Sequence, residues 1–208
     1  MRPLNKGPVP TVIAERAEML TRSFINSGGK TSPWAHEEIR STLMTETLSK
    51  CAYCEAKFLA VSFGDVEHML PKSLFPEHVL TWSNLTLACS RCNGSKGSKY
   101  NELLPFLDPY EDDISEHLYF AGPMIYALTD RGEYTITELD LMHPARIEAR
   151  DRVIKALESL CRRRDGAESD YIRDRLNALI VEFVESSEYT MAVSSYLAGR
   201  KKSPINMK

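Results

Sequence analysis

Four of the five cysteines in the chain stand in two Cys-x-x-Cys pairs, CAYC and CSRC. A Cys-x-x-Cys turn delivers two thiolates to one ion, and four thiolates satisfy the tetrahedral preference of Zn²⁺. The 34 residues between the pairs exceed the usual spacing of about 15–20 in a zinc ribbon, so a further unit is inserted between them. Four thiolates leave no open coordination position. We therefore expect a structural zinc site made by Cys51, Cys54, Cys89 and Cys92.

Polar residues in and just beyond the inserted unit could carry out chemistry: Glu67-His68, Asn84 and Asn93. Carboxylate and amide oxygens are hard ligands suited to Mg²⁺ or Mn²⁺, and two protein ligands suffice for Mg²⁺ because it retains several waters. A histidine can take a proton from water at neutral pH. Because strand side chains alternate between faces, Glu67 and His68 should point in opposite directions unless the strand kinks. Each residue alone is more typical of a surface pair or a turn, and only their order between two cysteine pairs favours a site.

The elements that must position these residues follow from the apolar periodicity. Apolar residues recur at three- and four-residue steps over 11–26, which predicts an amphipathic helix. A second helix should begin with Ser32 as N-cap and Pro33 at its first position, and run to Ser49. The central segment then predicts strand material over 57–66, a loop at 70–72, a strand over 80–89 and a short helix over 91–100.

The remainder of the chain reads as a connector, two strands and three helices. Strands over 117–128 and 133–139 would be joined by a turn at Thr129-Asp130-Arg131-Gly132. Helices should follow over 144–164, 168–186 and 189–197. Residues 1–10 look like a loose arm, and the basic tail beyond Gly199 should be frayed.

Length and composition limit the class of protein. The 208 residues suit one domain with extensions or two small ones. No apolar run approaches the roughly 20 residues that span a bilayer, and the polar N-terminus lacks the apolar core of a signal peptide. We therefore expect a cytoplasmic protein with no membrane partner, whose thiols stay reduced. The net charge of −3 argues against coating nucleic acid by bulk charge, and residues 105–143, with 1 basic against 9 acidic side chains, look like a solvated surface.

The stretches GDVEHMLPKS and WSNLTLACSRCNGSKG resemble the HNH nuclease family, whose ββα-metal fold is similar to the strand–strand–helix order predicted above. The resemblance implies that His68 is the general base and that Glu67 and Asn93 bind a catalytic Mg²⁺ or Mn²⁺. Asp65 matches a frequent acid two positions before the metal ligand. The last residue of the family pattern is Asn here, where many members have His.

Two further residues take roles from the same resemblance. Asn84 would fasten the loop and orient the histidine, and Lys96 would contact or neutralise the phosphate. Paired Cys-x-x-Cys knuckles also flank the core in many members. The expected fold is α+β: a ββα-metal HNH core with four-cysteine zinc knuckles between helical flanks. Its expected divisions are 1–50 (N-terminal helices), 51–108 (zinc-stapled nuclease module) and 109–208 (hairpin and helices that could dock a partner).

The likeness also extends, over roughly residues 50–160, to the HNH subunits of Septu-type anti-phage systems, including retron-linked versions. It is carried by the segments EHMLPKS, LLPFLDPYEDDISEHLYF and TITELDL. It implies a partner ATPase of ABC type, and for retron-linked relatives a reverse transcriptase with its DNA. The implied activity is metal-dependent hydrolysis of nucleic-acid phosphodiesters in antiviral defence, with DNA favoured over RNA.

Two other functions fit the same residues. A zinc-stapled module could bind phosphates through Lys72, Arg91, Lys96 and Lys99 without cutting. A ribonuclease-like toxin could cut tRNA or another structured RNA, although no obvious platform of aromatics for single-stranded bases is present. The remaining candidate ligands are expected to be surface, structural or packing residues: His36, His78, His117, His143 and Cys161.

Overall fold

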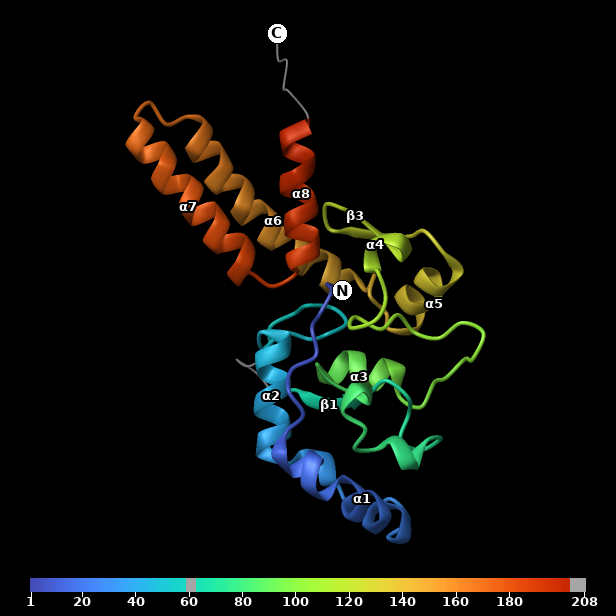
Figure 1. Cartoon of the computed structure of the whole chain (residues 1–208). Helices are drawn as coiled ribbons and strands as arrows, with labels where there is room; N and C mark the ends of the chain where they lie inside the picture. Colours follow the sequence, from blue (N-terminus) through green and yellow to red (C-terminus); the bar gives the residue numbers. More distant parts are fainter. Residues whose placement is uncertain (59–62, 203–208) are drawn as a thin grey trace.

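The computed structural model describes residues 1–58 and 63–202, with side chains up to residue 200. At its centre β1 (Asp65–His68) pairs antiparallel with β2 (Leu85–Ala88), and α3 (Ser90–Lys96) follows directly. The helix α3 packs against β1 (Figure 1). This order of strand, loop, strand and helix confirms the α+β class and the predicted succession of elements.

The strands are shorter than the sequence pattern suggests. The predicted strand over 57–66 meets β1 only at its last two residues, and residues 59–62 of that range lie outside the described chain. The predicted strand over 80–89 begins only at Leu85, because the preceding residues form a 3₁₀ turn, η3 (Trp82–Asn84). A second 3₁₀ turn, η2 (Pro76–His78), lies earlier in the same loop.

Of the two N-terminal helices, the first packs on η2 in the loop between the strands, and the second packs on the strand pair itself. The helix α1 (Thr11–Asn26) has the predicted bounds. The second predicted helix is split into a 3₁₀ turn, η1 (Pro33–Ala35), and α2 (Glu37–Thr47), which packs against β2. His36 caps α2 by accepting a hydrogen bond from the Glu38 backbone N–H, whereas Ser32 makes no side-chain cap.

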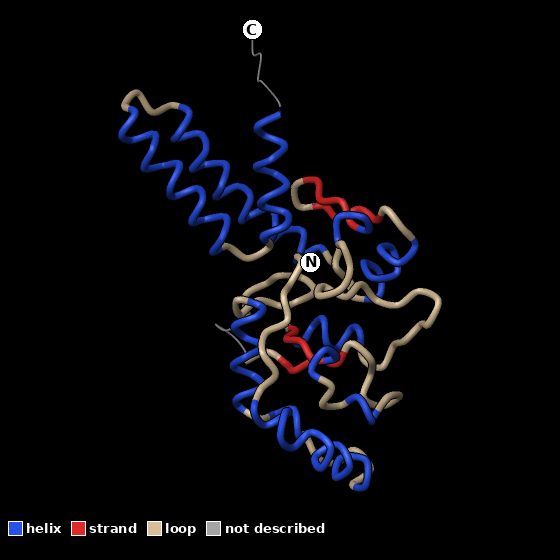
Figure 2. The backbone as a smooth tube through the Cα atoms, in the orientation of Figure 1, coloured by secondary structure: helices blue, strands red, loops and turns tan. Residues whose placement is uncertain are grey.

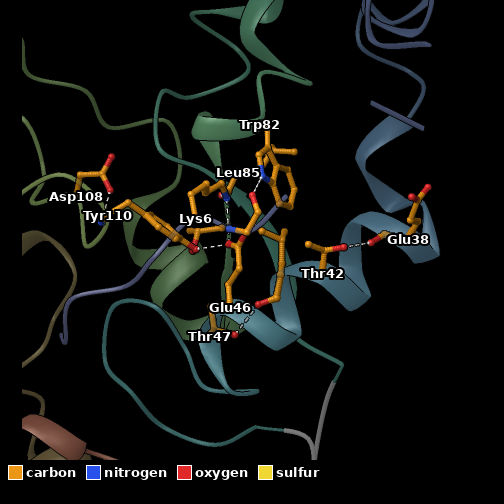
Figure 3. Close-up of polar contacts among 12 residues, drawn as sticks. Lys6, Glu38, Thr42, Glu46, Thr47, Trp82, Leu85, Asp108 and Tyr110 are labelled. Atoms are coloured by element: carbon orange, nitrogen blue, oxygen red, sulfur yellow. Dashed lines mark hydrogen bonds and ion pairs between the residues drawn. The ribbon is translucent and has the colours of Figure 1, made fainter. Parts of the chain in front are cut away.

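The ten residues ahead of α1 are bound, so the prediction of a loose arm is wrong. Lys6 Nζ donates to the Leu85 carbonyl at 2.6 Å and pairs with Glu46 at 3.1 Å (Figure 3). The same ammonium lies 3.9 Å from the ring centroid of Trp82 and 4.5 Å from that of Tyr110. The Tyr110 hydroxyl also donates to Glu46, so a partly buried cation joins three distant segments. Burial lowers the pKa of Lys6, with Glu46 opposing the shift.

The hairpin beyond the central module lies earlier in the chain than predicted. The pair β3 (Leu118–Ala121) and β4 (Met124–Ala127) turns at Gly122, with φ +58°, and α4 (Ile114–His117) precedes it. The second predicted strand is instead the helix α5 (Asp130–Glu138). Its N-cap is Thr129, whose hydroxyl accepts from the Gly132 N–H, so the residues read as a hairpin turn start a helix.

The C-terminal helices form a group beside the module. The helix α6 (Pro144–Asp165) packs on α7 (Asp170–Ser186) and α8 (Thr190–Lys202), and α8 packs on β3 (Figures 1 and 2). The first two match their predicted ranges closely, whereas α8 continues past Leu197. The predicted frayed tail falls largely on 203–208, outside the described residues. Of the described helices none has the length and apolar run that crossing a bilayer requires.

The packing around α5 predicts opposite effects for two glycine substitutions. A Cβ at Gly132 would clash with the His117 carbonyl oxygen, whereas a Cβ at Gly199 in α8 would meet no described atom within 4 Å. We expect Gly132→Ala to lower the free energy of unfolding by about 1–3 kcal/mol, as overpacking does. Gly199→Ala should leave it unchanged or raise it by up to about 1 kcal/mol. Urea denaturation of both variants tests this, and equal stabilities would contradict the described position of α5.

Candidate active site and metal centre

The four paired cysteines meet at one point. Their sulfur atoms all lie within 4.8 Å of one another, and those of Cys54 and Cys89 are 3.8 Å apart. The first pair lies in a turn closed by the Cys51 N–H on the Ala56 carbonyl, and the second pair starts α3. Among the residues that the structure describes, no other group of three or more His, Cys, Asp or Glu side chains is arranged to hold a metal ion.

The chemistry of this cluster fits zinc. Three of its cysteines are buried and Cys89 is partly exposed. Burial raises the pKa of the Cys51 thiol well above its usual range, while hydrogen bonds from the neighbouring cysteines lower the pKa of Cys89. A bound divalent cation would let all four sulfurs be thiolates, because its charge offsets their mutual repulsion. The cluster therefore has the donor set and the closeness of a four-thiolate zinc site.

His68 is held in a defined orientation. Its Nε2 lies 3.1 Å from the buried Val79 carbonyl, and a carbonyl can only accept, so Nε2 carries the proton and Nδ1 keeps a free lone pair. The ring meets Trp34 edge to face, with centroids 4.9 Å apart. Burial lowers the pKa of His68 to about 4, although the bond to Val79 opposes this shift. The imidazole is therefore neutral at pH 7 and able to accept a proton.

Glu67 faces α3 and is paired with Lys96, whose Nζ lies 2.8 Å from Glu67 Oε1. The same ammonium donates to the His68 carbonyl at 2.7 Å, and the Lys96 side chain is 0% exposed. Burial raises the pKa of Glu67, while Lys96 acts in the opposite direction. Lys96 therefore neutralises the carboxylate from inside the module and does not reach a phosphate at the surface, contrary to the role implied by the resemblance.

Asn93 and Asp65 are brought together beside this pair. Asn93 Nδ2 donates to Asp65 Oδ2 at 3.0 Å. Asp65 and Glu67 share one face of β1. Asn93 lies one helical turn before Lys96, on the face of α3 that packs against β1. Asp65, Glu67 and Asn93 therefore place hard oxygen donors on one side of the strand, and these donors suit Mg²⁺ or Mn²⁺.

Asn84 fastens the loop between the two strands. Its Oδ1 accepts from the Leu70 N–H at 2.7 Å, and its Nδ2 donates to the carbonyls of His78 at 3.0 Å and Leu70 at 3.3 Å. His78 directly precedes Val79, whose carbonyl holds the ring of His68. Asn84 thus acts on the histidine through the loop backbone, without touching its ring.

The candidate phosphate-binding residues differ in their surroundings. Lys72 is exposed, with Nζ 5.2 Å from the ring centroid of Trp34, next to His68. Arg91 is exposed at the start of α3. Lys99 is paired with Glu138 of α5 at 2.7 Å, so its charge is largely neutralised within the chain. Lys72 and Arg91 are therefore the better placed of the four basic candidates.

Two residues that touch the site come from outside the module. Trp34, expected only as a core residue, contacts His68, and Arg146 of α6 donates to the Cys92 sulfur. Nothing in the local sequence indicates either contact, because each depends on packing between segments far apart in the chain. The remaining histidines cap helices or form surface hydrogen bonds, and Cys161 packs among apolar side chains: His36, His78, His117, His143 and Cys161.

Comparison with known proteins gives two kinds of match. The profile of the HNH endonuclease family matches residues 51–99. The chain is 28% identical over 209 residues to Septu protein PtuB of Bacillus thuringiensis, a match that covers 93% of this chain and 80% of that protein. It is 28% identical over 155 residues to Septu protein PtuB of Bacillus mycoides (strain KBAB4), covering 59% of this chain and 52% of that protein. The first match extends beyond the family segment on both sides.

Loss of one cysteine ligand should release the metal. We expect Cys51→Ser to purify with less than stoichiometric zinc and with a lowered melting temperature, because binding energy at a structural zinc site is also folding energy. Cys161→Ala, which removes a buried thiol outside the cluster, should retain its zinc. Elemental analysis and thermal melts of both variants measure this. A Cys51→Ser protein with full zinc and an unchanged melting temperature would disprove the structural role.

Proposed function

Because the chain carries an HNH endonuclease domain at residues 51–99 and is homologous to Septu protein PtuB, we propose that it hydrolyses nucleic-acid phosphodiesters as the nuclease of a Septu-type anti-phage system. DNA is the favoured substrate. The observation that supports this most directly is the orientation of His68: its Nε2 is bound to the Val79 carbonyl, which leaves Nδ1 to accept a proton.

His68 acts as the general base. Its Nδ1 takes a proton from water as the water oxygen bonds to phosphorus, and the bond from phosphorus to the leaving oxygen breaks. The contact with Trp34 and the bond to Val79 hold the ring in one orientation, which lowers the entropic cost of reaching that geometry. Asn84 is a positioning residue, because it fixes the loop that carries the Val79 carbonyl.

Glu67 and Asn93, with Asp65 beside them, would hold the catalytic Mg²⁺ or Mn²⁺. When bound, this ion would stabilise negative charge on the phosphate and on the leaving oxygen. Burial raises the pKa of Glu67, and Lys96 opposes that shift and so favours the charged carboxylate that a cation would need. Lys72, which lies near the ring of Trp34, and Arg91, at the start of α3, are exposed and would contact the nucleic-acid backbone.

The flanking helices would serve assembly. The module at 51–108 carries the chemistry, while residues 1–50 and 109–208 support it and present surfaces to partners. The helix α7 exposes large apolar side chains along its length, which suit a protein partner: Tyr171, Ile172, Leu179 and Val181. The partner proposed from the Septu relationship is an ABC-type ATPase, and in a retron-linked setting the complex would include a reverse transcriptase and its DNA.

Removing the general base tests this function. We expect His68→Ala to cleave about 10²–10⁴-fold more slowly than wild type, with zinc content retained. Plasmid DNA and total RNA are incubated with each protein in Mn²⁺ or EDTA, with and without the cognate ATPase. His78→Ala is the matched control, because His78 lies in the same loop and its ring bonds only to nearby exposed groups.

Each outcome assigns a different function. Metal-dependent DNA cleavage lost only in His68→Ala supports the proposal. Cleavage of RNA alone identifies a ribonuclease instead. No cleavage in any mixture by zinc-loaded wild type, together with nucleic-acid binding, favours a binding module. Cleavage by His68→Ala at the wild-type rate would rule out this assignment of the base.

A further inference from the structure

Arg146, in the first turn of α6, points its guanidinium at the four-cysteine cluster. Its Nη2 donates to the Cys92 sulfur at 3.1 Å, and its Nη1 donates to the carbonyls of Leu139 at 2.7 Å and Asp140 at 2.8 Å. The residue is only 5% exposed. Three hydrogen bonds therefore hold a buried positive charge against one of the sulfur atoms.

This charge has no carboxylate partner. Across the described ion pairs, which end with residue 200, none involves Arg146. A buried guanidinium needs a counter-ion, because desolvation of an unpaired charge is strongly unfavourable. A zinc ion with four thiolates carries a net charge of −2, and a charge-assisted hydrogen bond from an arginine would stabilise it. Arg146 would therefore supply a positive charge to the Cys92 thiolate, and the thiolate would supply the counter-ion of Arg146.

The first cysteine pair is also held by the C-terminal helices. Glu55, which follows Cys54, accepts from the Tyr189 N–H through its carbonyl at 3.2 Å. Its Oε2 accepts from the Met191 N–H, at the start of α8, at 3.1 Å. Both halves of the cluster are therefore bonded to helices that lie outside the matched family segment.

We propose that Arg146 is part of the four-cysteine metal site, as the charge partner of the Cys92 thiolate, and that the C-terminal helices complete this site. Zinc retention and the docking of α6 on the module are then coupled. This coupling stands independently of the nuclease chemistry, because none of its residues belongs to the proposed catalytic set.

Zinc affinity of full-length variants tests the proposal. Arg146→Met removes the charge and the hydrogen bonds while keeping much of the apolar volume. Competition with a chromogenic zinc chelator should show an affinity about 10- to 100-fold lower than that of wild type, as is typical when a partner of a metal ligand is lost. Arg152→Met on the same helix is the control, since the Arg152 side chain is 75% exposed and pairs only with Glu148, and it should bind zinc like wild type.

The alternative is that Arg146 only packs α6 against the loop at 139–140. A folded Arg146→Met with a lowered melting temperature and wild-type zinc affinity would overturn the proposal. If that variant is unfolded as purified, recovery of its fold with added zinc supports the coupling. The Arg146→Gln variant keeps an amide that can donate to the two carbonyls. If neither Arg146→Met nor Arg146→Gln folds in excess zinc, Arg146 has a purely structural role, and the proposal is overturned.

Discussion

The closeness of two cysteine pairs that are far apart in sequence is the constraint on which this structure depends. Cys54 and Cys89 lie 3.8 Å apart at their sulfurs and close a loop that contains both central strands. Each strand has four residues, and a strand pair of this size is not stable alone in water. Closing the loop with a metal restricts the unfolded chain, while contacts from outside the loop supply the apolar packing.

Inside the loop, one buried ammonium determines how the acid-His dipeptide is presented. Lys96 binds the Glu67 side chain and the His68 carbonyl together, so the two residues keep the alternation of an ordinary strand. The carboxylate turns to α3 and the imidazole to Trp34. Burying Lys96 and Glu67 as a pair avoids the cost of an isolated charge, and loss of either would leave the other uncompensated. Charge balance and side-chain geometry therefore depend on the same contact.

Local patterns predicted the parts of this molecule that local physics determines. The periodicity of 11–26 and the Pro144 start of α6 depend on neighbouring residues only, and both predictions match the structure. Each Cys-x-x-Cys motif is also local, and the preference of one ion for four thiolates predicted that the two pairs meet. The wrong prediction of a hairpin turn at Thr129–Gly132 also concerns local structure, because Thr129 suits the N-cap of a helix as well as a turn.

The remaining differences come from tertiary contacts. The resemblance assigned Lys96 to the phosphate, whereas its pairing with Glu67, 29 residues away, depends on tertiary packing. The arm around Lys6 looked loose because its acceptors, Leu85 and Glu46, belong to other segments. In both cases folding brings the partners of the positive charge close to it, and the periodicity of the sequence does not indicate those partners.

The network around Lys6 also bears on how this protein can change over time. One side chain from the N-terminal arm, one from α2 and one from beyond α3 share a single hydrogen-bonded cluster (Figure 3). A crossover at either border of the family segment, residues 51–99, would separate Tyr110 from Lys6 and Glu46 and remove the hydroxyl that donates to the buried Glu46 carboxylate. The set of residues that must remain compatible is therefore larger than the family segment. We expect Lys6, Glu46 and Tyr110 to be inherited and replaced together.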